Sequence, residues 1–258
     1  MSKKKVAILI SGFIRNWKDT YEELLKNVIE YNSDMYEFEL HCVPYSRTNR
    51  YNNENYEKLE QVTEEEIINL QKKYNPTSFN VLDHKKLTNY FINEKKDIIN
   101  SIKTYWEHPK MLTYKVGTIM LQAYAMEESY RLIETMANKY DLIIKTRFDV
   151  FYSKPCKIPV CEQNKILMLT RYSNQNFVDH VLCGYPKSMA CFMKSYSNLE
   201  NTNFMNKNNI KYAEDLFRET IKTNNISIGL MDWECELGRP YGRLPLYDPY
   251  VVNIMAKK

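Results

Sequence analysis

Hydrophobic residues along the chain occur in two patterns, as short apolar or alternating runs and as longer stretches with helical spacing. The short runs predict β-strands, because a strand covered on both faces is apolar throughout and a half-covered strand alternates. The predicted strands lie at 5–11, 38–45, 79–84, 140–147, 165–170 and 180–185.

Stretches with apolar residues at steps of three and four predict helices between these strands. Thr63 and Glu66 have the spacing of a capping box at the start of one of them. The polar stretch 45–61 and the stretch 238–250, rich in Pro, Gly and Tyr, are predicted to be loops. The predicted helices lie at 19–31, 63–75, 85–103, 111–138 and 209–223.

Strands that alternate with helices form βαβ units. The chain is therefore predicted to be an α/β protein with a mostly parallel central sheet and helices on both faces. One domain over residues 1–258 is the simplest organisation. Sheets of this kind bind ligands at the carboxyl ends of their strands. Two predicted strands end in residues suited to a ligand, Ser11–Arg15 and Arg147–Asp149, so we expect the site there.

The composition of the chain limits which kinds of molecule it is expected to bind. With 44% hydrophobic and 26% charged residues, the chain of 258 residues is expected to fold as a globular protein. Its 36 basic and 32 acidic residues give a net charge of +4, which is too small to indicate a nucleic-acid partner. The same excess, gathered in one place, would suit a small polyanionic ligand.

Several familiar signatures are missing from the sequence. The six cysteines form no C-x-x-C pair, so we expect free thiols in a reducing compartment rather than a zinc site. No apolar stretch approaches about 20 residues, which predicts a cytoplasmic protein without a transmembrane segment. A P-loop and a G-x-G-x-x-G motif are both absent, which argues against a P-loop NTPase and a Rossmann-type methyltransferase.

The residues at the ends of these strands could bind a ligand. Gly12 would let a ligand approach the backbone, and Arg15 could fork onto a phosphate. Asp149 could hold Mg²⁺ or Mn²⁺ against phosphate oxygens, beside the guanidinium of Arg147. Each motif also has a purely structural interpretation, a strand-to-helix turn with a solvated arginine and a simple salt bridge.

Taken in order, these motifs carry a resemblance. They are Ser11–Arg15 (S-G-F-I-R), Met111–Lys115 (M-L-T-Y-K) with a later Tyr130, Tyr140–Asp149 (Y-D-L-I-I-K-T-R-F-D) and Asp179–Gly184 (D-H-V-L-C-G). Together they resemble GT-A-type nucleotide-sugar glycosyltransferases, in particular poorly characterised viral and bacterial surface-glycan transferases with S-G-x-x-R and R-x-D motifs. Each motif is short, and the order and spacing carry the specificity.

The resemblance implies a Rossmann-like GT-A fold with a nucleotide-binding half, 1–150, and an acceptor-binding half, 151–258. It implies transfer of a sugar from a nucleotide-diphosphate donor to a glycan or lipid-linked acceptor in glycan biosynthesis. It also implies a Mn²⁺ or Mg²⁺ ion on Asp149, although this motif has one carboxylate where the usual D-x-D has two. The implied donor-binding residues are Ser11, Gly12, Arg15, Tyr114, Lys115, Lys145 and Arg147.

An inverting transferase needs a carboxylate base for the acceptor hydroxyl. The candidates are Asp179, Glu214 and Asp215. Asp179 could instead cap a turn. Glu214 and Asp215 could instead stabilise the start of their helix through its dipole. Two other classes stay open: a non-catalytic nucleotide- or carbohydrate-binding domain, and a Rossmann-like methyltransferase.

Overall fold

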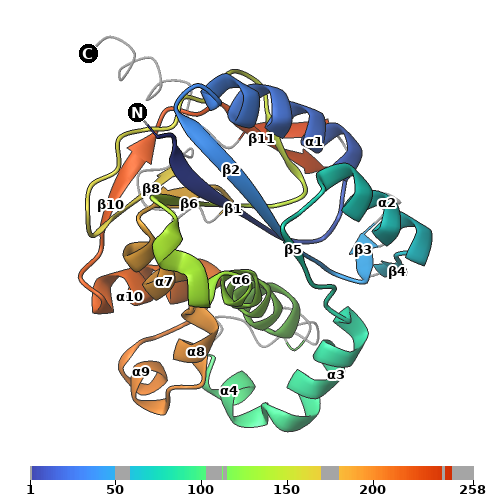
Figure 1. Ribbon diagram of the computed structural model, residues 1–258. Coiled ribbons are helices and arrows are strands. Elements are labelled where there is room, and N and C mark those ends of the chain that lie inside the picture. Colours follow the sequence, from blue (N-terminus) through green and yellow to red (C-terminus); the bar gives the residue numbers. More distant parts are fainter. Residues whose placement is uncertain are drawn as a thin grey trace.

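The computed structural model describes residues 2–49, 59–102, 112, 115–169, 180–239 and 242–245. These residues form a seven-stranded central sheet with helices on both of its faces (Figure 1). The predicted α/β class is therefore confirmed.

Six of the seven strands of the central sheet run in one direction, and β9 runs antiparallel between β6 and β8. The predicted strand at 79–84 is shorter than expected, because only its start enters the sheet. Across the sheet the order is β10 (Ser227–Met231), β8 (Lys165–Leu169), β9 (Leu182–Gly184), β6 (Leu142–Thr146), β1 (Lys4–Gly12), β2 (Tyr36–Pro44) and β5 (Ser78–Phe79).

The continuous apolar run in β1 is explained by burial on both faces. Ala7 and Leu9 pack into a core on one face, and Val6, Ile8 and Ile10 pack into a second core on the other. Successive side chains of a strand point to opposite faces, so a strand between two helical layers has no polar side. Packing on both faces therefore holds β1 in place, and with it the residues at its carboxyl end.

Helices α1 (Trp17–Leu24) and α2 (Glu64–Tyr74) cover one face of the sheet. The capping box of Thr63 and Glu66 is confirmed at the start of α2. The other face is covered by α6 (Leu121–Arg131), which the π-helical turn η3 (Lys115–Met120) precedes, and by the following helices. These are α3 (His84–Glu94), α4 (Lys96–Ser101), α7 (Pro186–Met193), α8 (Ser195–Leu199), α9 (Thr202–Lys207) and α10 (Ala213–Thr223).

Helix boundaries depart from the sequence pattern in several places. The helix predicted at 19–31 is α-helical only as far as Leu24 and continues as a π-helical turn, Leu25–Ile29, and a 3-10 turn, Glu30–Asn32. The helix predicted at 85–103 breaks at Lys95 into two. The long pattern at 111–138 ends in a separate 3-10 turn, η4 (Glu134–Lys139). Periodicity reports the buried face and does not distinguish these neighbouring helical forms.

Both loop predictions were wrong in part. Within 45–61, β3 (Arg47–Asn49) pairs antiparallel with β4 (Leu59–Gln61), and this pairing joins backbone groups without needing apolar side chains. Near the end of the chain, β11 (Cys235–Arg239) pairs with β12 (Gly242–Pro245) and with β7 (Val150–Tyr152). Glycine and proline near these strands concealed them from a reading by composition.

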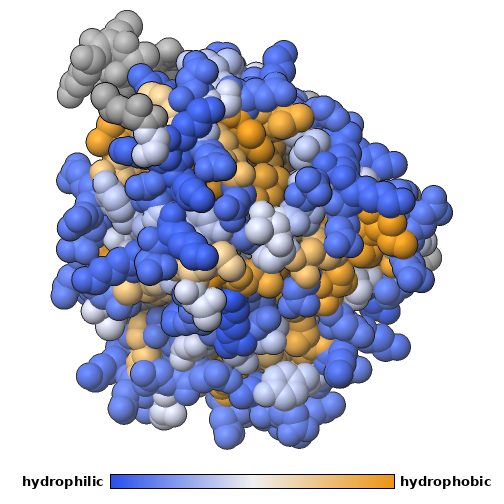
Figure 2. Space-filling view, viewed as in Figure 1, coloured by the Kyte–Doolittle hydropathy of each residue, from blue (hydrophilic) through white to orange (hydrophobic). Residues whose placement is uncertain are grey.

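Two further findings concern the surface and the cysteines. On the face drawn in Figure 2, hydrophilic residues cover most of the surface and hydrophobic residues appear as small separate areas. Within the described ranges, no helix has the length and apolarity needed to cross a membrane. All six cysteines are free thiols, as predicted.

Candidate functional site

A cleft of about 320 Å³ lies at the carboxyl edge of the parallel strands. The ends of β1 and β6, the start of α10 and the first turns of the η3–α6 segment surround it. Six residues that the sequence singled out line this one cleft: Ser11, Gly12, Arg15, Lys145, Arg147 and Glu214. Their convergence supports the rule that placed the site at the strand ends.

The turn after β1 has an unusual backbone. Gly12 has φ +112°, a conformation that side-chain-bearing residues rarely adopt, and Asn16 is left-handed at φ +50°. In the part of the chain that the structure describes, a Cβ on Gly12 would meet no atom within 4 Å, so the glycine is required by conformation and not by space. The hydroxyl of Thr20 in α1 donates to the carbonyl of Phe148 at 2.7 Å, which ties the helix that follows this turn to the residues after β6.

Asp149 is fully buried between two arginines. Its Oδ1 accepts from Nε of Arg147 at 2.9 Å, and its Oδ2 accepts from Nη2 of the same guanidinium at 2.8 Å. Nη1 of Arg15 lies 3.6 Å from Oδ2. A bidentate pair with a second guanidinium beside it is among the strongest ways to hold a buried carboxylate.

Charge, not burial, decides the ionisation of this carboxyl group. Burial raises the pKa of Asp149, but Arg147 and Arg15 lower it by more, with a smaller contribution from His180, so the pKa lies below its usual value. Asp149 is therefore ionised at neutral pH. With Lys145 also in the cleft, the site keeps an excess of positive charge.

This geometry does not fit a divalent ion at Asp149. Both carboxylate oxygens accept hydrogen bonds from one guanidinium, and the side chain is 1% exposed. Two neighbouring guanidinium groups would also repel a dication. Within the described ranges, no three or more His, Cys, Asp or Glu side chains gather as a metal centre. The divalent ion stays a prediction.

The remaining predicted donor residues have different positions. Lys145, at the end of β6, is 2% exposed and lines the cleft. Lys115 does not line it; its ammonium donates to the carbonyl of Ile99 at 2.9 Å, and burial lowers its pKa. Tyr114 and the candidate base Asp179 lie outside the described residues.

The two acids at the start of α10 are separated by the fold. Glu214 lines the cleft. Asp215 instead accepts from the backbone N–H groups of Lys211 and Tyr212, both at 3.1 Å, and pairs with Arg218. Asp215 is therefore engaged in starting the helix, and Glu214 is the better placed of the two for chemistry.

The sequence did not identify the floor and the aromatic wall of the cleft. Gly117, Gln122 and Ala125 belong to the η3–α6 segment and line the cleft. A Cβ on Gly117 would meet no atom of the described residues within 4 Å, so the missing side chain leaves space at the cleft. In the sequence, these lining residues could have been found as the small and polar positions that interrupt the apolar pattern of 111–138.

The aromatic wall is formed beside the turn after β1. Phe13 and Tyr45 line the cleft with their rings 5.2 Å apart, and His84, which does not line it, has its ring 5.5 Å from that of Phe13. The guanidinium of Arg15 lies 5.1 Å from the centre of the Phe13 ring. Flat apolar rings next to cations suit a ligand that has both an aromatic base and a phosphate.

No protein-family model matches the chain, and no curated protein matches it. Among solved structures, the galactosyltransferase LgtC, in complex with donor and acceptor sugar analogs, is similar over 88% of this chain and 72% of its own, at 10% identity and a TM-score of 0.42. Mouse xyloside xylosyltransferase 1 in its apo form is similar over 90% of this chain and 86% of its own, at 8% identity and a TM-score of 0.39. Both are glycosyltransferases.

Proposed function

We propose that the protein transfers a sugar from a nucleotide-diphosphate donor to a hydroxyl of a glycan or another acceptor. The observation that carries the proposal is one cleft in which Arg15, Lys145 and Arg147 lie with the carboxylate of Glu214. Cations suit a diphosphate, and a carboxylate suits an acceptor hydroxyl.

The cations would act on the leaving group. The bond between the anomeric carbon and the phosphate oxygen breaks, and the electron pair leaves with the nucleoside diphosphate. Arg15, Lys145 and Arg147 would stabilise that growing charge, an interaction that is stronger in the transition state than in the donor. A guanidinium has five N–H donors, so an arginine held by Asp149 can also bind phosphate oxygens.

Glu214 would act on the acceptor. As the acceptor oxygen forms its bond to the anomeric carbon, its proton passes to the carboxylate of Glu214, as in an inverting transfer. Asp179 stays an alternative base. Asp149 does not contact the substrate in this proposal; it is a positioning residue that orients Arg147 and Arg15.

Thermal unfolding with nucleotides tests the donor. We expect nucleoside diphosphates such as UDP or GDP to raise the unfolding temperature of the full chain more than the monophosphates do, since binding to the folded state stabilises it. Each nucleotide is measured with Mn²⁺ and with EDTA, which also tests the predicted ion. Stabilisation by S-adenosylmethionine and by no nucleoside diphosphate would contradict the proposal and favour a methyltransferase.

Donor turnover separates a transferase from a binding domain. A transferase in excess over a nucleotide sugar slowly hydrolyses it even without the acceptor, because water takes the sugar and the nucleoside diphosphate is released. A carbohydrate- or nucleotide-binding domain binds the donor and leaves it intact. Binding of UDP-sugars or GDP-sugars without any release over hours would therefore favour the binding domain.

A further inference from the structure

A second cavity, of about 600 Å³, lies at the opposite edge of the central sheet. It is surrounded by η4, by the turn at Gln163–Asn164 before β8 and by the start of α7. Strand β9 crosses the sheet between the two sites: His180, before it, lines the cleft, and Tyr185, after it, lines the second cavity. The two sites share no lining residue.

Ser188 is the unusual residue of this cavity. Ser188 lines the cavity and is 2% exposed, and its Oγ, itself buried, has no hydrogen-bond partner among the described residues. A buried hydroxyl without a partner costs free energy, and native proteins contain few of them. A rotation of this side chain toward the cavity would let a ligand oxygen supply the missing partner.

The start of α7 favours a negative charge at the same place. Pro186 begins the helix, and the N–H of Met189 already donates to the carbonyl of Tyr185 at 2.9 Å. The N–H groups of Lys187 and Ser188 belong to the first turn, which has no acceptors within a helix. A helix start of this kind attracts anions.

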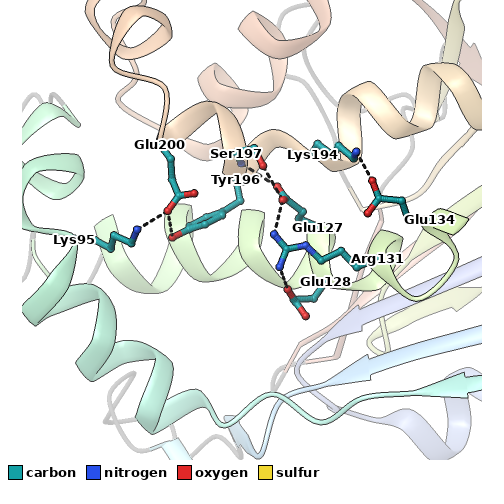
Figure 3. A network of polar contacts seen from close by, with 9 residues as sticks. All are labelled: Lys95, Glu127, Glu128, Arg131, Glu134, Lys194, Tyr196, Ser197 and Glu200. Atoms are coloured by element: carbon teal, nitrogen blue, oxygen red, sulfur yellow. Dashed lines mark hydrogen bonds and ion pairs between the residues drawn. The ribbon is translucent and has the colours of Figure 1, made fainter.

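The charged side chains agree with this preference. Glu134 is the acid among the residues that line the cavity, and it is paired with Lys194 (Figure 3). Lys187, which also lines the cavity, is exposed and has no ion-pair partner among the described residues. Among the described lining residues, the acid Glu134 is therefore neutralised and the cation Lys187 remains.

The other lining groups are uncharged and suit a sugar. Amide side chains both donate and accept hydrogen bonds, as sugar hydroxyls do. Tyrosine rings provide apolar surface for the C–H face of a sugar ring. The volume is within the range of small-ligand sites. These lining residues are Asn138, Gln163, Asn164, Tyr130 and Tyr185.

We propose that this cavity binds a saccharide that carries a carboxylate or phosphate group. The anionic group contacts Ser188 and the first-turn N–H groups of α7, and the amides contact the sugar hydroxyls. The site goes beyond the proposed transfer reaction, because it lies at the other edge of the sheet and shares no residue with the cleft.

Titration calorimetry on the full chain tests the site with D-glucuronate and D-glucose 6-phosphate, against D-glucose and inorganic phosphate. Both anionic sugars are expected to bind more tightly than either control. Ser188→Ala should weaken their binding about fivefold, the loss of one hydrogen bond. The same variant should unfold at the same or a higher temperature than the parent, because the hydroxyl it removes has no hydrogen-bond partner in the described part of the free protein.

Ser129→Ala is the matched control. Ser129 is equally buried, but its Oγ donates to the carbonyl of Met126 at 2.7 Å. This variant should unfold at a lower temperature and bind the anionic sugars normally. The proposal is overturned if neither anionic sugar binds, if D-glucose or phosphate alone binds as tightly, or if Ser188→Ala binds normally and loses stability as Ser129→Ala does.

Discussion

The two edges of the central sheet hold their polar groups in different ways. At the carboxyl edge, buried Asp149 is bound by Arg147 and approached by Arg15. At the opposite, amino edge, the buried hydroxyl of Ser188 has no hydrogen-bond partner among the described residues. A buried charge requires partners inside the protein, so the cations of the cleft are fixed before any ligand arrives. A neutral hydroxyl costs less to bury, so its partner can be left to a ligand.

The largest effect is expected when the fixed charge is removed. Asp149→Ala leaves two guanidinium groups without their carboxylate, and it should lower the free energy of unfolding by about 3–5 kcal/mol. Nucleoside diphosphate binding should weaken as well, because the arginines lose their orientation. Urea denaturation and thermal shift with UDP or GDP measure the two effects.

Glu162→Ala is the control for this variant. Glu162 pairs with Lys165, but its side chain is 70% exposed, so its removal should cost no more than about 1 kcal/mol. If Asp149→Ala unfolds at the parent's urea midpoint and loses only a Mn²⁺-dependent thermal shift, the carboxylate binds a metal and our positioning role is wrong.

Within the carboxyl edge, the two acids of α10 should separate reaction from stability. Glu214→Gln should lower the rate of sugar transfer by about 10²–10⁴, the usual contribution of a general base, and leave nucleoside diphosphate binding unchanged. Single-turnover rates and thermal shifts measure these quantities. A loss of binding with an unchanged rate would make Glu214 a donor-binding residue.

Asp215→Asn should show the opposite result. Asp215 accepts from two backbone N–H groups and pairs with Arg218, so its loss should lower the free energy of unfolding by about 1 kcal/mol with an unchanged transfer rate. A fall in rate as large as that of Glu214→Gln would return Asp215 to the catalytic candidates.

The backbone of the cleft can be tested at Gly12. Gly12→Ala adds a Cβ that meets no atom, so its cost comes from φ +112° alone and should be about 1–3 kcal/mol. Chemical denaturation measures this cost. Gly117→Ala is the control, since its Cβ also meets no atom but its backbone lies outside the region that requires glycine. Equal stability of both variants would contradict the conformational role of Gly12.

The sequence predicted the carboxyl edge better than the amino edge, for a physical reason. Residues at the end of β1 and β6 follow continuous apolar runs, and parallel strands bring their ends together. The cavity at the amino edge is built from η4, a turn and the start of α7. Hydrophobic periodicity does not predict that these three segments meet. The sequence around Ser188 is ordinary, and only the structure shows that its hydroxyl is in an unusual environment.

Within the carboxyl edge, the sequence could not assign roles. Glu214 and Asp215 are adjacent, and only the helix decides that one faces the cleft and the other caps the turn. Lys115 belongs to a motif that predicted donor binding, but its ammonium donates to Ile99. Motifs report which residues are present at a spacing, whereas burial and partners decide which of their groups remain available to a ligand.

The smallest effect at neutral pH concerns two buried histidines, in contrast with the ionised groups of the cleft. Burial lowers the pKa of His41 and of His84 to about 4. Below their unfolded pKa of about 6.5, the unfolded chain binds protons that the folded chain does not, so stability falls as the pH drops from about 6.5 to about 4. Asp149, with its lowered pKa, stays ionised through this window. Urea midpoints between pH 7.5 and 4.5 should therefore decline less in His41→Gln/His84→Gln than in the parent, whatever the variant's stability at pH 7.5. Parallel declines would show that other groups, not these histidines, make the fold sensitive to acid.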